Sequence, residues 1–140
     1  MTKPTGVGRG NGRREGYLQG VPDISEVDLA WLAGLLEGEG CFSTPSPGAP
    51  CRIYIQMTDQ DVMEKVGRLV NRRVGRNHPP SHRDRGWKPT YRVVINGRPA
   101  RTWMLRLYPF MGARRREKID QILQNFDHNK VRKPLDPAPL

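Results

Sequence analysis

Residues 32–40 read Leu-Ala-Gly-Leu-Leu-Glu-Gly-Glu-Gly, and this stretch joins a short apolar helix to two carboxylates. Ala30, Gly34 and Gly38 recur every four residues, so they share one helical face and leave it almost bare of side chains. Glycine inside a helix costs about 1 kcal/mol relative to alanine, and close packing is the usual compensation. The spacing therefore predicts a helix that packs against a copy of itself.

Both ends of this helix can be read from the sequence. Ser25 and Asp28 offer N-caps, and the helix is predicted to run to about Glu37. Gly38 is expected to end it in the left-handed conformation, which places Glu39 just beyond the last carbonyls. Because those carbonyls carry the negative end of the helix dipole, a divalent cation is favoured there, and so is an isolated lysine.

The nonapeptide closely resembles the LAGLIDADG motif of the homing endonucleases, with glutamate in place of aspartate at both acidic positions. The competing interpretation is an ordinary amphipathic helix that is stopped by glycine and carries two solvated glutamates. The resemblance implies an α+β fold of the type αββαββα, with helices on one face of a saddle-shaped antiparallel sheet. Since one copy of the motif is present, it also implies a twofold homodimer.

The same resemblance implies a site-specific endonuclease that cuts double-stranded DNA with Mg²⁺ or Mn²⁺, on a long pseudo-palindromic site. Glu39 matches the family's metal-binding acid, the Gly38 carbonyl its backbone ligand, and Glu37 the acid that supports the helix end. One carboxylate per subunit suffices for Mg²⁺, because this ion keeps several waters and also takes carbonyl and phosphate oxygens. The residues implied at the dimer interface are Ala30, Ala33, Gly34, Glu37 and Gly38.

Two further catalytic positions follow from the resemblance. Asp59 comes after a strand end, where the family places a polar residue that orders water near the metal; a helix N-cap is the alternative. Arg114 comes after the turn at residues 108–110, where family members place a basic residue that steadies the phosphate. Arg115, Arg116 and Lys118 compete for this role, and a solvated basic helix start is the other interpretation.

Length and charge agree with a single DNA-binding domain. The chain has 140 residues and 36% hydrophobic content, and 24 Lys and Arg against 14 Asp and Glu give a formal net charge of +10. Such an excess is expected of a protein that meets a polyanion. No run approaches the roughly 18 apolar residues of a membrane span, and no apolar signal segment is seen. We expect double-stranded DNA and a second copy of the chain as partners, with no membrane and no small-molecule substrate, in the cytoplasm or on DNA.

Three regions are predicted along the chain. Residues 1–24 form a Gly-rich basic arm, residues 25–126 the endonuclease domain, and residues 127–140 a tail whose end is too rich in proline for a helix. Strands are predicted near residues 41–42 and over 51–58, 74–78 and 90–96, with a basic loop at 79–89. Further helices are predicted over 59–70, from residue 99 to about 107, and over 113–126. Cys41 and Cys51 are expected to be small, reduced core residues.

One face of the strand at 51–58 predicts DNA recognition. Arg52, Tyr54 and Gln56 alternate with apolar residues and therefore share a face. In the major groove, Arg can bind guanine and Gln can bind adenine through paired hydrogen bonds. Half-exposed strand positions are often merely polar, which is the alternative. The further basic residues expected along the DNA backbone are Arg76, Arg83, Arg85, Lys88 and Arg92.

Other classes of protein compete with the endonuclease. A non-catalytic sequence-specific DNA-binding protein of the same fold predicts the same basic saddle and dimer, and only strand scission separates the two. A zinc module using Cys41, Cys51, His78 and His82 lacks the close cysteine pair that preorganises such sites. A His-Asn-His nuclease lacks the tight ligand spacing, and an RNA maturase is expected to carry two motifs.

Overall fold

The computed structural model describes residues 21–44 and 48–135, with side chains as far as residue 125. Most of the predicted arm and the last residues of the predicted tail lie outside this description. The helices are α2 (Glu26–Glu39), α3 (Gln60–Val70), α4 (Pro80–Asp84), α5 (Gly97–Leu107), the 3₁₀ turn η1 (Tyr108–Phe110) and α6 (Ala113–Leu135). The strands are β1 (Gly40–Ser43), β2 (Arg52–Met57), β3 (Gly75–Asn77) and β4 (Thr90–Asn96).

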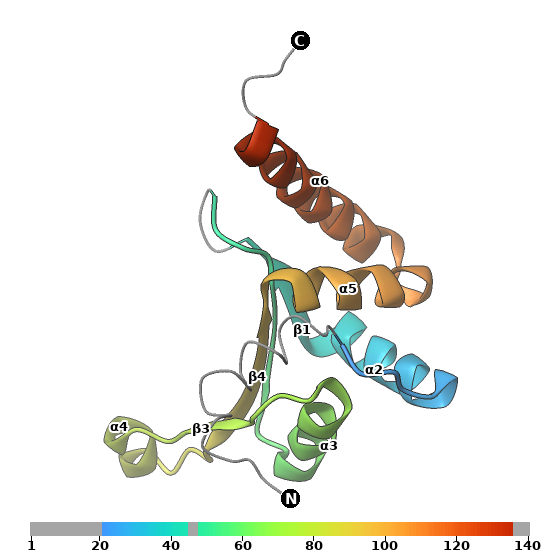
Figure 1. Ribbon diagram of the computed structural model, residues 1–140. Helices are drawn as coiled ribbons and strands as arrows, with labels where there is room; N and C mark the ends of the chain where they lie inside the picture. Colours follow the sequence, from blue (N-terminus) through green and yellow to red (C-terminus); the bar gives the residue numbers. More distant parts are fainter. Residues whose placement is uncertain (1–20, 45–47, 136–140) are drawn as a thin grey trace, which may run out of the picture.

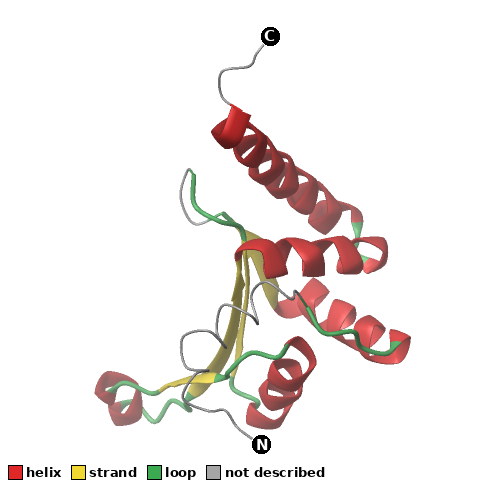
Figure 2. Ribbon diagram, viewed as in Figure 1, coloured by secondary structure: helices red, strands yellow, loops and turns green. Residues whose placement is uncertain are grey.

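The four strands form one antiparallel sheet in the order β1-β2-β4-β3. Helices α2, α3, α5 and α6 lie on one side of it, and the short α4 projects on the other side at one end (Figure 1). Apart from α4, the opposite face carries no helix among the described residues, as the colouring in Figure 2 shows. The α+β class is confirmed, and so is the predicted order of helices and strands, apart from α4 between β3 and β4.

The covered face of the sheet forms the core. In β2 and β4, Ile53 pairs with Ile95 and Ile55 with Val93, and all four side chains are at most 3% exposed. Since side chains alternate along a strand, a slip of one residue would turn all four toward solvent, so their burial fixes the register. The helices pack against them with Leu32, Leu36, Val66, Val70, Trp103 and Leu107.

Helix α2 begins as predicted but ends differently. Ser25 is its N-cap, and Ser25 Oγ accepts a hydrogen bond from Asp28 N at 3.0 Å. The expected left-handed Gly38 cap is wrong, because the helix continues through Glu39 and ends at Gly40 with φ −87°. A Cβ on Gly40 would lie 2.6 Å from Leu36 Cδ2, so this glycine lets the first strand leave close to the helix.

Three other expectations are corrected. The basic loop contains helix α4, which starts at Pro80, a residue whose fixed φ suits a first helical turn. The last helix does not end at Phe126 but continues to Leu135, since no glycine or proline interrupts residues 126–133. Cys51 is buried as expected, but Cys41 is exposed, because alternation along β1 turns it away from buried Phe42.

Candidate active site and DNA-binding surface

The end of α2 holds two carboxylates in different surroundings. Glu37 is half-buried, and its Oε1 accepts a hydrogen bond from Gly112 N at 2.9 Å. Its carbonyl oxygen accepts two more from Arg115, at 3.2 Å from Nε and 3.0 Å from Nη2. Glu39 is exposed and has no hydrogen bond or ion pair within the described part of the chain. Glu37 therefore ties α2 to the start of α6, while the Glu39 carboxylate is available for a ligand.

The small-residue stripe of α2 faces solvent. Ala30, Gly34 and Gly38 are exposed, and a Cβ added to either glycine would have no neighbouring heavy atom within 4 Å. Val27 lies on the same helical face one turn earlier and is 78% exposed. Ala33 is corrected: it is 2% exposed and belongs to the core of its own protomer. The protomer therefore gives no packing reason for glycine at residues 34 and 38.

An open groove between β1 and α6 begins beside Glu39. Its walls are residues 40–43 of β1 and Arg114, Arg115, Glu117, Lys118 and Gln121 of α6. Arg115 is committed to the Glu37 carbonyl, and Arg116 donates to the Pro109 carbonyl at 3.0 Å. Arg114 and Lys118 are exposed on the groove wall without such partners among the described residues. Of the competing basic residues, these two remain free to meet an anion.

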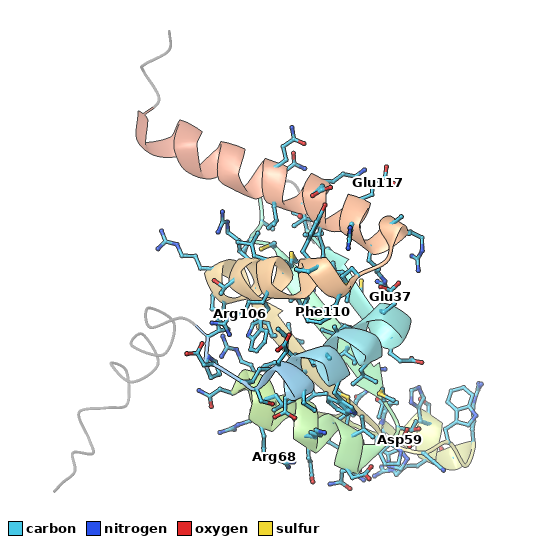
Figure 3. All side chains as sticks on the ribbon, turned by 90° about the vertical axis from the view of Figure 1, so that its right-hand side faces the viewer. Glu37, Asp59, Arg68, Arg106, Phe110 and Glu117 are labelled. Carbon is cyan, nitrogen blue, oxygen red and sulfur yellow. The ribbon has the colours of Figure 1, made fainter. Side chains whose placement is uncertain are left out.

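Asp59 lies away from this groove. It is the N-cap position of α3, but its side chain makes no capping hydrogen bond. Figure 3 shows Asp59 well separated from Glu37 and the end of α2. Among the described residues, no cluster of three or more His, Cys, Asp or Glu side chains is arranged to hold a metal ion. A single protomer thus brings two carboxylates to the groove, Glu117 on its wall and Glu39 just before its first residue, Gly40, and it does not bring Asp59 there.

The open face of the sheet carries positioned polar side chains. Arg52 Nε donates to Asn96 Oδ1 across the strand pair at 3.2 Å, which leaves the two terminal nitrogens of the guanidinium directed elsewhere. Tyr54 Oη donates to Gln56 Oε1 on the same face of β2. Both contacts hold long side chains in one orientation, so less conformational entropy is lost when they meet a ligand.

The basic residues of β3 and β4 separate into two groups. Arg92 pairs in register with Gln56 and Gly75, so it extends the open face toward the sheet edge. Arg76 pairs with buried Tyr91, and its side chain therefore lies on the helix-covered side. Arg76 is exposed but does not share the face of Arg52 and Gln56, and its contact with the DNA backbone stays a prediction.

A family model described as a LAGLIDADG-like domain matches residues 26–106, more than half of the chain. The chain belongs to the LAGLIDADG family. No match was found among curated protein sequences.

Two solved structures of the homing endonuclease I-CvuI share the fold of this LAGLIDADG protein. The first, bound to the I-CreI target with 2 mM Mg and with the DNA not cleaved, has a TM-score of 0.55 and 13% identity. That alignment covers 78% of this chain and 71% of that chain. The second, bound to its own target with 2 mM Ca, has a TM-score of 0.53 and 12% identity, and covers 81% of this chain and 87% of that chain. At these identities the likeness concerns the fold.

The described residues of this LAGLIDADG protein do not support the alternative interpretation as a zinc module. Cys41 is exposed on β1, and Cys51 is buried with its Sγ donating to the Gly97 carbonyl. The His82 ring lies against Trp87 at a tilt of 57°. No zinc-type cluster forms among the described residues. Within the same residues, no helix has both the length and the apolar character needed to cross a membrane.

Val27 and Trp87 were not predicted as site residues from the sequence, and Arg115 was predicted only as an alternative to Arg114 at the phosphate. Val27 could have been found, because it continues the spacing of the small-residue stripe by three residues. Trp87 could also have been noticed as a tryptophan inside a basic segment. The contact of Arg115 with Glu37 had no local signal, because Glu37 lies 78 residues earlier in the chain.

Proposed function

We propose that this protein is a site-specific, divalent-metal-dependent endonuclease that cuts double-stranded DNA as a homodimer. The observation that carries the proposal is the free, exposed Glu39 carboxylate at the end of α2, beside a basic groove and at the end of an exposed stripe of small residues. Membership of the LAGLIDADG family supports the nuclease chemistry.

The donor set beside Glu39 suits Mg²⁺ or Mn²⁺. Glu39 supplies a carboxylate, and the Gly38 carbonyl belongs to the last turn of a helix, where carbonyl oxygens have no intrahelical donor. Both are hard oxygen ligands, which Mg²⁺ prefers while retaining several waters. The chemistry that the bound ion supplies is a nucleophilic water and neutralisation of phosphate charge.

Other side chains near Glu39 are proposed to position the backbone and to bind phosphate. Glu37 fixes the end of α2 against Gly112 and Arg115, so the backbone next to Glu39 is held in place. Arg114 and Lys118 stand on the groove wall as cations for the scissile phosphate and its neighbours. Asp59 is given no part in this chemistry, because it lies away from the groove in the protomer, although no capping bond occupies its carboxylate.

The homodimer is proposed from the exposed face of α2. Ala30, Gly34 and Gly38 would let two copies of the helix approach almost backbone to backbone, and Val27 would extend the contact by one turn. A twofold axis through this contact brings the α2 ends of both protomers, each with its Glu39, toward the same region. Two cuts, one per strand, then follow from two equivalent sites.

The duplex is proposed to lie on the open face of the sheet. Arg52 and Gln56 are placed to meet base edges in the major groove, with Tyr54 orienting Gln56. Arg92 extends this face, and the cations beyond β3 are proposed to meet the sugar-phosphate backbone. The net charge of +10 favours such a complex at low salt.

Incubation with a randomised duplex library in Mg²⁺, followed by sequencing of the new DNA ends, tests the proposal. Cutting at a recurrent, roughly palindromic sequence is expected, because the two protomers would read inverted half-sites. If the same duplex sequences are bound repeatedly but remain intact, the protein is instead a non-catalytic DNA-binding protein of the same fold. If the protein neither binds nor cuts any duplex, both functions are excluded.

A further inference from the structure

The segment between β3 and β4 forms a small structured unit that we name the β3–β4 tip, residues 78–89. It contains α4, none of whose residues is buried, so the core of the protein does not require it. In Figure 1 the tip projects past the end of the sheet on the side away from α2, α5 and α6. It therefore reaches toward the face on which we propose that DNA lies.

The backbone of Trp87 is held in this tip by hydrogen bonds, although the residue is 51% exposed. Its backbone N–H donates to the His82 carbonyl at 2.9 Å, and its carbonyl oxygen lies 2.9 Å from His78 Nε2. Gly86, with φ +77°, turns the chain just before it. Exposed tryptophan is unfavourable in water, and fixing it by two backbone contacts preorganises it for a partner.

The surroundings of the ring define what kind of partner it can take. The Arg85 guanidinium carbon lies over the ring, 5.1 Å from its centroid, and the His82 ring lies 4.9 Å away at 57°. Because the Arg85 side chain lies over the ring, a base could stack on that face only by displacing it, while the exposed half of Trp87 can still contact a partner. Arg83, Arg85 and Lys88 are exposed around it, with Asp84 as the one carboxylate of the tip.

We infer that Trp87 is a further DNA contact, whose exposed part packs on the deoxyribose rings of the duplex backbone while the cations of the tip meet the adjacent phosphates. The inference rests on the proposed function, since it needs the duplex on the open face. An apolar ring beside cations complements a backbone that alternates sugars and phosphates. Such a contact reads no base, and it adds affinity equally to every sequence.

The test measures binding of a fluorescently labelled mixed-sequence duplex by anisotropy over a series of NaCl concentrations, without Mg²⁺. Trp87→Ala is expected to weaken binding about tenfold at every salt concentration, with an unchanged slope of log K against log salt. Trp87→Phe is expected to restore part of the loss. Arg85→Gln is expected to reduce the slope by about 0.9, because one phosphate contact is removed.

Arg68→Gln is the matched control, since Arg68 is an exposed arginine on α3, on the helix-covered side (Figure 3). It should leave affinity and slope close to those of the parent. Thermal melting of each variant checks folding, and little change is expected because no α4 residue is buried.

Equal binding by Trp87→Ala and the parent would overturn the inference while leaving the proposed DNA binding intact. A loss confined to the preferred cleavage sequence would also overturn it, in favour of base insertion by the ring. No binding by the parent itself would overturn the proposed function, and the inference with it.

Discussion

The two sides of β2 and α2 carry opposite kinds of side chain. On the covered side, Ile53 and Ile55 of β2 and Leu36 of α2 are nearly inaccessible and pack into one core. On the open side, β2 presents positioned polar groups, and α2 presents a stripe with almost no side chains. The covered side therefore contributes most of the folding stability, and the open side can carry ligand-binding groups at little cost to it. Substitutions on each side should therefore have separable effects.

Glu39→Gln is expected to have the largest effect. Loss of the metal-binding carboxylate should lower DNA cutting in Mg²⁺ by about a thousandfold, which is about 4 kcal/mol in the barrier. Glu37→Gln is the control, because its side-chain oxygen can still accept the hydrogen bond from Gly112 N. Gel assays of cutting in Mg²⁺ and of binding in Ca²⁺ check both variants. Equal cutting by Glu39→Gln and the parent would dismiss Glu39 as a ligand.

Ile55→Ala should destabilise the core on the covered side of the sheet. Truncating a side chain that is 2% exposed is expected to lower the free energy of unfolding by about 2–5 kcal/mol, from lost transfer energy and a residual cavity. Urea unfolding followed by circular dichroism measures it. Where the variant remains folded, its choice of DNA sequence should match that of the parent. A changed preference would argue that the two sides are not separable.

Gln56→Ala should affect the open side of the same strand. It is expected to cost about 1–3 kcal/mol in discrimination at the base pair that it reads. The free energy of unfolding should change by less than about 0.5 kcal/mol, because the side chain is exposed. Competition between single-base variants of the cleavage site measures the first effect. An equal loss of affinity for every single-base variant would indicate that Gln56 contacts the DNA backbone and does not read a base.

Gly34→Ala should have opposite effects on the stability of the protomer and on dimerisation. With no heavy atom within 4 Å of the new Cβ, the helix gains about 0.5–1 kcal/mol in the isolated protomer. The same methyl group should weaken self-association by holding two α2 helices apart. Gly67→Ala is the control, since its Cβ would lie 2.8 Å from the Arg72 carbonyl oxygen and should destabilise α3. Sedimentation and thermal melting give both readouts, and unchanged association would count against the α2 interface.

Tyr108→Phe should have the smallest effect. Tyr108 Oη donates to Asp120 Oδ2 at 3.1 Å, and this hydrogen bond raises the pKa of Tyr108 above its ordinary value of 10.0. The stabilisation belongs to the protonated phenol, so it is present below pH 10.0 and is lost as pH rises through the higher pKa of the folded state. The Tm of the parent should slightly exceed that of the variant at neutral pH, and the difference should shrink in alkali. A constant difference across pH would exclude the hydrogen bond as its source.

Local patterns were sufficient for most of the fold. Alternation gave β4 over Thr90–Asn96 and β2 within one residue at each end, because burial on one face of a strand leaves a period of two in the sequence. The end of α2 was not predictable from the motif alone. Gly38 looks like a cap, yet the helix continues to Gly40, where close approach to Leu36 demands a glycine.

The candidate site was predictable only in part. The motif predicted that Glu37 and Glu39 lie close to the end of a helix, but it placed Glu39 beyond the helix, whereas α2 includes it. The different surroundings of the two carboxylates depend on Gly112 and Arg115, which lie far along the chain. The orientation of Arg76 depends on the register of β3 against β4, and a one-residue shift reverses it. The structure of the β3–β4 tip depends on backbone hydrogen bonds around Trp87, which leave no hydrophobic period.

The exposure of Cys41 has a practical consequence. The chain has two cysteines, and Cys51 is 1% exposed, so a maleimide dye should attach to one position per protomer in the native protein without any substitution. Cys41 lies two residues after Glu39 and lines the groove. Energy transfer between dyes on the two protomers of a dimer would report the distance between their Cys41 residues. Quenching of the dye on addition of DNA would report the rate at which DNA binds.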